Sequence, residues 1–298
     1  MRRAALLIAL VAVSLPAAAK PAFPPRTDDD LPNVQSGSAI VVDRKDGTVM
    51  YEKNADEVRN IASTGKIFIA LLARERDIDL ATETEITEAD QQLARGGART
   101  RLPVGYSFDN LDLLRAMLVA SDNRAPSAIG RAIGLDTDAL IEALNAYAKT
   151  IGLENTTFED PPGLRGNTST AREMAVAFRK ALDDDIVAEI LGTPEVIIAS
   201  TKPKQRQIKY FNTNRSLKSG KARVIGGKTG YTDAAGYCLI IAAEVDGREV
   251  AMVFLGSQGK MTRYGDFGRV VGWMEDGMPN ADKAVAGGKG KAAASAAK

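Results

Sequence analysis

The chain has 298 residues, of which 39 are Lys or Arg and 38 are Asp or Glu, so its net charge of +1 points to neither a nucleic-acid nor a membrane partner. It contains no histidine and one cysteine, Cys238. These counts exclude a Ser-His-Asp triad, a Cys-His dyad, a zinc-thiolate site and an internal disulfide. Acid–base chemistry therefore falls to Lys, Asp, Glu or Tyr, and neither a metal nor a cofactor is expected.

Residues 1–19 have the pattern of a secretory signal peptide. Arg2 and Arg3 precede an apolar run over residues 4–15, and three alanines follow at 17–19. The run is shorter than the ~20 apolar residues that span a bilayer, so we expect export and cleavage rather than a transmembrane anchor. Residues 20–35 form a proline-rich leader to the folded part.

Two hairpins are predicted, one near each end of the mature chain. Asp46-Gly47 separates strands at 38–43 and 48–51, and Asp246-Gly247 separates strands at 236–245 and 249–255. Cys238 lies in one of these strands and is expected to be a small buried apolar side chain. The helical spacing of apolar residues predicts helices over 111–119, 140–151, 170–182 and 266–275.

Strands at both ends and helices in the middle indicate an α+β fold. We expect the terminal segments to share one antiparallel sheet with flanking helices, and the middle to form a helical subdomain at about residues 80–200 within a single domain at 36–277. Residues 278–298 consist mainly of Ala, Gly and Lys, which provide too little apolar surface to fold, so they are expected to be a disordered tail.

Without histidine, a hydroxyl nucleophile needs a lysine whose ammonium is easily deprotonated. Ser63 and Lys66 are three residues apart and share one face of a helix that begins at Ser63. The apolar run 67–72 would bury this helix. Two more S-x-x-K patterns start at Ser257 and Ser295, but neither leads into a buried helix. A purely structural interpretation, in which Ser63 caps a core helix, remains open.

Two further polar triplets occur later in the chain. Ser121-Asp122-Asn123 follows the predicted helix 111–119, where it either ends the helix or brings a hydroxyl and an amide into a cleft. Lys228-Thr229-Gly230 leads into a strand. Lys218-Ser219-Gly220 has a similar form but runs into a polar turn, so we prefer the later copy.

The three motifs S-x-x-K, S-D-N and K-T-G, in this order, resemble those of the low-molecular-mass penicillin-binding proteins, the serine-type D-alanyl-D-alanine carboxypeptidase and endopeptidase family. The resemblance runs from about residue 38 to about residue 273. It includes the segments Asn155-Thr-Thr-Phe158, Pro162-Gly-Leu164, Ser169-Thr-Ala-Arg172 and Asn212-Thr-Asn214. The compact chain, without an appended β-rich C-terminal domain, is most similar to the DD-endopeptidase branch of this family. Gly65 departs from the pattern of this family, in which Thr commonly precedes the lysine of S-x-x-K.

The resemblance implies a β-lactamase/transpeptidase-like fold and a penicillin-sensitive peptidase, an endopeptidase and/or a carboxypeptidase, that cuts D-Ala peptide bonds of peptidoglycan, with a role in cell shape. The signal-peptide pattern predicts that it is periplasmic or secreted to the cell envelope. Stem peptides would be its substrates and β-lactams its acylating inhibitors. It further implies four catalytic residues: Ser63 as nucleophile, Lys66 as its base, Ser121 as proton carrier to the leaving amine, and Asn123 to orient Lys66.

The resemblance also implies a substrate-binding strand, formed by Lys228, Thr229, Gly230 and Tyr231. The backbone N–H groups of Ser63 and Tyr231 would form the oxyanion hole. Gly230 would let the substrate peptide lie close to the strand. Charge repulsion between Lys66 and Lys228 would favour a neutral Lys66.

Three alternatives remain. A β-lactamase of the same fold needs a carboxylate that positions water, for which Glu159 and Asp160 are the candidates. A nucleotide-binding P-loop is suggested by residues 226–229, but the first glycine of that motif would fall on Ala222. A wall-binding protein without activity is disfavoured by the intact polar motifs.

Overall fold

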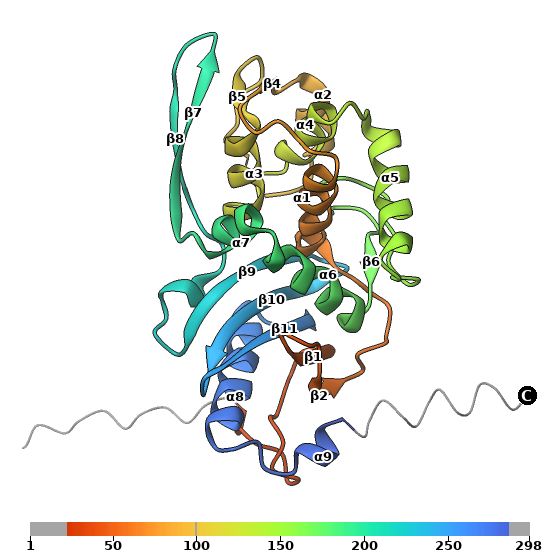
Figure 1. Ribbon diagram of the computed structural model, residues 1–298, viewed down its shortest axis with the longest axis vertical. Coiled ribbons are helices and arrows are strands. Elements are labelled where there is room, and N and C mark those ends of the chain that lie inside the picture. Colours follow the sequence, from red (N-terminus) through yellow and green to blue (C-terminus); the bar gives the residue numbers. More distant parts are fainter. Residues whose placement is uncertain (1–22, 99, 286–298) are drawn as a thin grey trace, which may run out of the picture.

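The computed structural model describes residues 23–98 and 100–285, so the predicted signal peptide lies outside the described residues. Its centre is a five-stranded antiparallel sheet in the order β2-β1-β11-β10-β9 (Figure 1). The strands come from both ends of the chain, as predicted. They are β1 (Ser38–Asp43), β2 (Val49–Lys53), β9 (Arg223–Thr232), β10 (Gly236–Val245) and β11 (Arg248–Ser257).

Both Asp-Gly hairpins are confirmed. β1 pairs with β2, and β10 pairs with β11. Asp246 and Gly247 have φ values of 48° and 72°, the left-handed pair that a two-residue hairpin turn requires and that Asp-Gly adopts readily. β9 pairs with β10 of the second hairpin and is the last strand of the sheet, so its outer edge is free.

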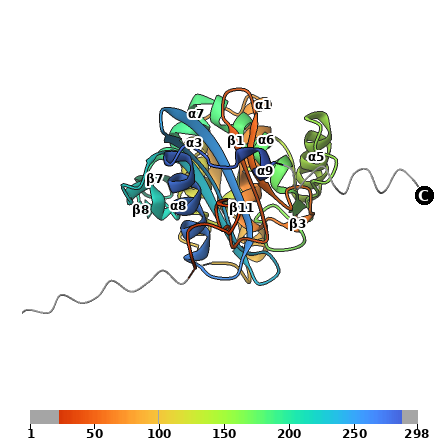
Figure 2. The same ribbon diagram turned by 90° about the horizontal axis from the view of Figure 1, so that it is seen from below.

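Helices cover both faces of the sheet. On β10, Leu239 and Ile241 belong to the apolar cluster that contains Trp273 of α8 (Thr262–Glu275), whereas Ile240 points into the opposite cluster. This alternation follows from the two-residue period of a strand and makes the sheet apolar on both sides. Figure 2, a view from below, shows α8 against the face of the sheet opposite α1 and α6.

The helical part above the sheet also contains strands, which we did not predict. The helices are α1 (Lys66–Glu75), α2 (Glu88–Leu93), α3 (Asn110–Val119), α4 (Ala125–Ala132), α5 (Thr137–Thr150), α6 (Ala171–Asp183) and α7 (Asp185–Gly192). A four-stranded sheet accompanies them, formed by β4 (Glu83–Glu85), β5 (Ser107–Asp109), β7 (Glu195–Lys202) and β8 (Gln207–Phe211). β4 and β5 have three residues each and are too short to show an alternating pattern, whereas β8 does alternate between exposed and buried residues and was overlooked.

The remaining elements are short. β3 (Arg59–Asn60) pairs with β6 (Thr168–Ser169), and the single-turn helices η1 (Ala62–Gly65) and η2 (Arg215–Lys218) precede α1 and β9. Three of the four predicted helices match α3, α5 and α6 within three residues at each end. The fourth, α8, starts at Thr262 instead of 266, because its first turn is polar and gives no apolar signal.

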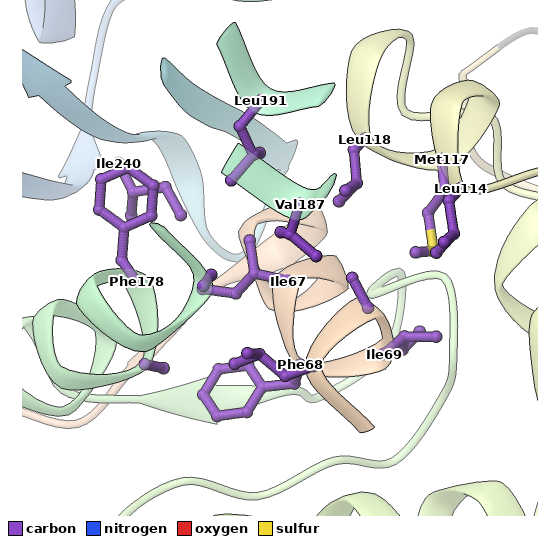
Figure 3. Close-up of a cluster of buried hydrophobic side chains, with 14 of the residues drawn as sticks. Ile67, Phe68, Ile69, Leu114, Met117, Leu118, Phe178, Val187, Leu191 and Ile240 are labelled. Carbon is purple, nitrogen blue, oxygen red and sulfur yellow. The ribbon is translucent and has the colours of Figure 1, made fainter. Parts of the chain in front are cut away.

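α1 passes through the centre of the molecule, and eight of its ten residues are buried. Figure 3 shows Ile67 and Phe68 of this helix among side chains from α3, α6, α7 and β10. Phe68 is fully buried and packs edge-to-face on Phe158, with the ring centroids 5.0 Å apart. A helix enclosed on all sides holds its first residues in one place, and these residues belong to the site described below.

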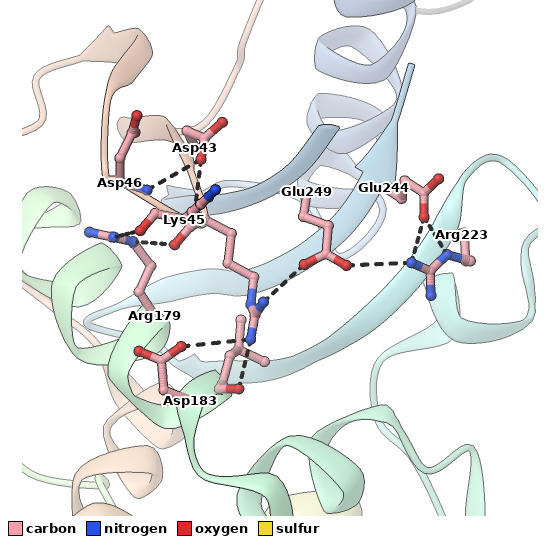
Figure 4. Close-up of polar contacts among 10 residues, drawn as sticks. Asp43, Lys45, Asp46, Arg179, Asp183, Arg223, Glu244 and Glu249 are labelled. Carbon is pink, nitrogen blue, oxygen red and sulfur yellow. Dashed lines mark hydrogen bonds and ion pairs between the residues drawn. The ribbon is translucent and has the colours of Figure 1, made fainter. Parts of the chain in front are cut away.

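Polar contacts join the helical part to the sheet at β1 and β11. Arg44 donates to the carbonyl of Leu182 at the end of α6 and to Glu249 of β11, both at 2.9 Å. Arg179 of α6 donates to the carbonyls of Arg44 and Lys45 in the first hairpin turn (Figure 4). These bonds fix α6 on the sheet far from its free edge.

The leader and the start of the predicted tail pack on the sheet domain. Arg26 donates to the carbonyl of Gly272 in α8 at 3.0 Å. Residues 281–284 were expected to be disordered, but they form α9 (Ala281–Ala284), because Ala284 finds an apolar site beside β2 and is only 2% exposed. Residues 286–298 lie outside the described residues. Among the described ones, no helix combines the length and apolar character needed to cross a membrane.

Candidate active site

Ser63 lies in η1, a 3₁₀ turn that runs directly into α1, so a helix is present at Ser63 as the pairing with Lys66 required, and its α-helical part starts three residues later. The chain bends sharply in front of it, because Ala62 has a left-handed φ of 48°. The Ser63 hydroxyl caps no helix. Apart from Lys66, its hydrogen-bond partner is the carbonyl of Pro162 at 3.4 Å, which removes the purely structural interpretation of this serine.

Lys66 is the first residue of α1, and its amine faces the hydroxyl of Ser63. The Nζ atom lies 3.1 Å from Ser63 Oγ and 3.1 Å from Ser121 Oγ, and it donates to Asn123 Oδ1. Lys66 is 1% exposed. Burial lowers its pKa to about 7, while the nearby carboxylates of Asp122 and Asp160 hold the pKa from falling further. At neutral pH a large fraction of Lys66 is therefore a neutral amine that can accept a proton.

Ser121 and Asn123 lie in the connection between α3 and α4, as the helix-ending pattern predicts. Ser121 has a left-handed φ of 62°, a conformation that is uncommon for serine and is found at functional sites. The buried carboxylate of Asp122 fixes this connection: it accepts hydrogen bonds from the hydroxyl of Tyr210 and the backbone N–H of Arg101, both at 2.7 Å. The structural role of Asp122 was not predicted.

The K-T-G motif lies within β9, on the free-edge strand. Thr229 donates to the hydroxyl of Thr213 at 2.8 Å. A Cβ atom placed on Gly230 would lie 3.1 Å from the backbone nitrogen of Ser63, so only glycine lets β9 approach η1 this closely. Tyr231 is 48% exposed at the end of the strand. The motif lies in a strand and not in a loop before a helix, which rules out the P-loop alternative.

Lys228 is fully buried beneath the site and does not line the cleft. Its amine donates to the carbonyl of Thr229. Burial lowers its pKa well below the usual range, and the positive charges of Lys66 and Arg263 lower it further. The charge repulsion between the two lysines thus acts on the pKa of Lys228, while burial is what lowers the pKa of Lys66, and contact between Lys228 and substrate stays a prediction.

The motifs meet in one cleft of about 630 Å³. Six of the residues predicted for the site line this cleft: Ser63, Ser121, Asn123, Thr229, Gly230 and Tyr231. The cleft also contains Thr213, Leu164 and Arg263, which we did not predict. Thr213 stands between Asn212 and Asn214, in a segment that sequence analysis had singled out, whereas Arg263 had no signal near it.

The competing copies of the motifs occupy structural positions. Ser257 is buried at the end of β11, where its hydroxyl lies 2.6 Å from that of Ser36. Lys218 is exposed and pairs with Glu195. Ser295 lies outside the described residues. The choice of Ser63 and of the later K-T-G copy is thus consistent with burial and contacts.

One of the two carboxylates considered for a β-lactamase is engaged in its own loop. Asp160 accepts the backbone N–H groups of Leu164 and Arg165, at 2.9 and 3.1 Å. The Glu159 carboxylate lies beside the Cα of Gly166. The contacts of Asp160 disfavour it as the group that would position a water for a β-lactamase.

A buried lysine and a second hydroxyl beside the Ser63 hydroxyl, at the free edge of an antiparallel sheet, define a class of serine enzymes that form acyl intermediates. Residues 25–259 match the D-alanyl-D-alanine carboxypeptidase family, and the chain belongs to that family. It is a serine-type DD-peptidase, as predicted.

Curated relatives support this membership over most of the chain. The D-alanyl-D-alanine endopeptidase of Escherichia coli is 31% identical over 89% of this chain and 86% of its own length. The D-alanyl-D-alanine endopeptidase of Pseudomonas aeruginosa is 30% identical over 96% of this chain and 93% of its own.

Solved structures confirm the α+β fold. The Streptomyces K15 DD-transpeptidase superposes with a TM-score of 0.76 at 25% identity, over 82% of this chain and 98% of its own. The D-alanyl-D-alanine carboxypeptidase of Mycobacterium tuberculosis gives a TM-score of 0.74 at 26% identity, over 82% of this chain and 92% of its own.

Proposed function

We propose that the protein cleaves D-Ala peptide bonds of peptidoglycan through an acyl-enzyme on Ser63. The observation that supports this most strongly is the position of the Lys66 amine, 3.1 Å from Ser63 Oγ in a buried setting that lowers its pKa to about 7. Lys66 accepts the hydroxyl proton while Ser63 Oγ bonds to the substrate carbonyl carbon. The oxyanion is stabilised by the backbone N–H groups of Ser63 and Tyr231.

Ser121 completes the first half of the reaction. Its hydroxyl is 3.1 Å from Lys66 Nζ, so a proton taken up by Lys66 can pass through Ser121 to the leaving amine as the C–N bond breaks. Asn123 accepts a hydrogen bond from Lys66 and keeps the amine in place. A water molecule then hydrolyses the ester and restores Ser63.

We further propose that the enzyme cuts cross-links between stem peptides, as an endopeptidase. Support comes from the endopeptidases of Escherichia coli and Pseudomonas aeruginosa, which this chain matches over 86% and 93% of their own lengths. A carboxypeptidase of Mycobacterium tuberculosis is covered over 92%, so the muropeptide test below decides between the two activities. The signal-peptide pattern of residues 1–19 supports action in the periplasm, where peptidoglycan lies.

The first test is the mass of the intact mature protein during incubation with benzylpenicillin. We expect one covalent adduct, and we expect Ser63→Ala to remove it while the unfolding temperature of the variant stays unchanged, because the Ser63 hydroxyl supports no helix. Purified cross-linked muropeptides then distinguish cleavage of cross-links from removal of a terminal D-Ala.

Other results would contradict the proposal. An adduct that persists in Ser63→Ala would place the nucleophile on another serine. Rapid hydrolysis of the drug without a lasting adduct would indicate a β-lactamase, and neither adduct nor turnover would indicate a wall-binding protein without activity.

A further inference from the structure

The peptide unit between Gly230 and Tyr231 connects the free edge of the sheet to its interior. Arg263 Nη1, at the start of α8, donates to the carbonyl oxygen of Gly230 at 2.9 Å and to that of Cys238, the residue opposite on β10, at 2.8 Å. The Gly230 carbonyl therefore points inward, toward β10. Because a trans peptide is planar, the N–H of Tyr231 points the other way, toward the free edge of β9.

This free edge faces the nucleophile. The Cβ position of Gly230 is 3.1 Å from the backbone nitrogen of Ser63, so the Tyr231 N–H emerges beside the other donor assigned to the oxyanion hole. The direction of the Tyr231 N–H is therefore set by the group that binds the Gly230 carbonyl, since both belong to the same planar peptide.

Arg263 is itself held firmly. It is 5% exposed, and its guanidinium lies between the rings of Tyr237 and Tyr264, at 5.2 and 5.1 Å from their centroids. Tyr237 in turn stacks on Tyr231, with the centroids 4.3 Å apart. The stack of three tyrosines and one arginine connects α8 to the end of β9.

We propose that Arg263 is a positioning residue of the acylation step. By holding the Gly230 carbonyl it fixes the direction of the Tyr231 N–H, and its positive charge polarises the peptide so that this N–H is a stronger donor to the oxyanion. The inference rests on the proposed acyl-enzyme and adds a residue that none of the three sequence motifs contains.

The test uses the full mature protein acylated by benzylpenicillin labelled with ¹³C at the lactam carbonyl. Difference infrared spectroscopy reports the stretching frequency of the ester carbonyl, which falls as its hydrogen bonds strengthen. The variants are Arg263→Met and Arg263→Lys. Arg269→Met is the matched control, because Arg269 is a largely covered arginine of α8, with a side chain 12% exposed, that pairs with Asp266 and not with β9.

In Arg263→Met we expect acylation to slow on the order of 10- to 100-fold, less than the loss of an entire oxyanion donor, and the ester band to move to higher wavenumber. Arg263→Lys should recover part of both effects. Arg269→Met should retain the wild-type band even if its unfolding temperature falls, because a loss of stability alone does not change the carbonyl environment.

An ester band at the wild-type wavenumber in Arg263→Met would overturn the proposal. If acylation were also slow in that case, Arg263 would act by direct contact with the substrate, for which its place on the cleft wall leaves room. A wild-type protein without any ester band, or an adduct that survives Ser63→Ala, would instead refute the acyl-enzyme on Ser63 and this inference with it.

Discussion

Lys66 must lose a proton before it can take one from Ser63, and burial brings this loss to about pH 7. Since the neutral amine is the reactive form, acylation by a chromogenic cephalosporin should rise with pH through about 7 and then level off. At pH 6 the rate should be about tenfold below the plateau. Stopped-flow rates between about pH 5.5 and pH 9 test this.

The control variant is Lys66→Arg, which keeps the positive charge at every pH. It should show no acylation anywhere in the range. A wild-type rate that does not change between the two ends of the range would contradict the role of Lys66 as the base.

Lys66 and Lys228 also affect stability. The pKa of Lys66 is about 7 in the folded protein and its usual value is 10.5, so between these values the unfolded chain binds more protons. The free energy of unfolding should therefore rise with pH across this window. The lowered pKa of Lys228 has the same effect.

Replacement of Lys228 by Met, which has a similar length and no charge, should stabilise the protein at pH 7 by about 1–3 kcal/mol and reduce the slope with pH. Urea unfolding at pH 7 and pH 9 measures both. Lys218→Met, at an exposed lysine, is the control and should leave both quantities unchanged. A destabilised Lys228→Met with an unaltered slope would contradict the argument.

At the scale of elements, η1 must stay in close contact with the loop that contains Gly163. A Cβ atom on Gly163, whose φ is 77°, would lie 2.6 Å from the carbonyl oxygen of Ala62, next to the nucleophile. Gly163→Ala should cost about 2–4 kcal/mol of stability, from backbone strain and a clash with the main chain, and should slow acylation because η1 is displaced.

Gly134 offers a matched comparison, since its φ is also 77° but no atom lies within 4 Å of its Cβ position. Gly134→Ala should cost only about 1–2 kcal/mol of strain and leave acylation unchanged. Equal effects of the two substitutions on acylation, measured with unfolding curves, would refute the idea that the loop holds η1.

The elements that sequence analysis predicted are those with strong local signals. Asp-Gly turns and apolar periodicity placed the two hairpins and the cores of α3, α5, α6 and α8. The pairing of β5 with β7, some ninety residues later, and the position of η1 against Gly163 were missed because long-range contacts form them, whereas the local β7–β8 hairpin was overlooked. Ser63, Lys66 and Asn123 were predicted from motifs, whereas Arg263 acts through backbone carbonyls that no side-chain pattern reveals.

At the scale of the whole molecule, Asp266 of α8 joins the leader to the sheet domain. Its fully buried carboxylate accepts the N–H groups of Gln35 and Ser36, both at 2.8 Å, and pairs with Arg269. Asp266→Asn removes the charge that pairs with Arg269 and brings an amide N–H₂ close to two backbone N–H groups, so it should lower the free energy of unfolding by about 3–5 kcal/mol.

Acylation per folded molecule should remain at the wild-type rate in Asp266→Asn, because neither Asp266 nor its partners at positions 35, 36 and 269 line the cleft. Asp276→Asn is the control: it lies at the end of the same helix and pairs with Arg26, but its side chain is 71% exposed, so it should cost less than about 1 kcal/mol. Chemical unfolding of both variants measures the difference, and equal costs would contradict the structural role of Asp266.

The leader and α9 meet each other on the surface: Lys283 pairs with Asp29 at 2.7 Å, and Asn280 donates to the Asp29 carbonyl at 3.0 Å. The chain from residue 29 to residue 283 therefore forms a nearly closed ring, because its two ends are in direct contact. A short linker between these two segments, with new ends in the exposed turn at 203–206, would give a circular permutant with the same contacts. In that chain K-T-G would come before S-x-x-K, so the order of the motifs depends on where the ring is opened, while the chemistry depends only on where they meet.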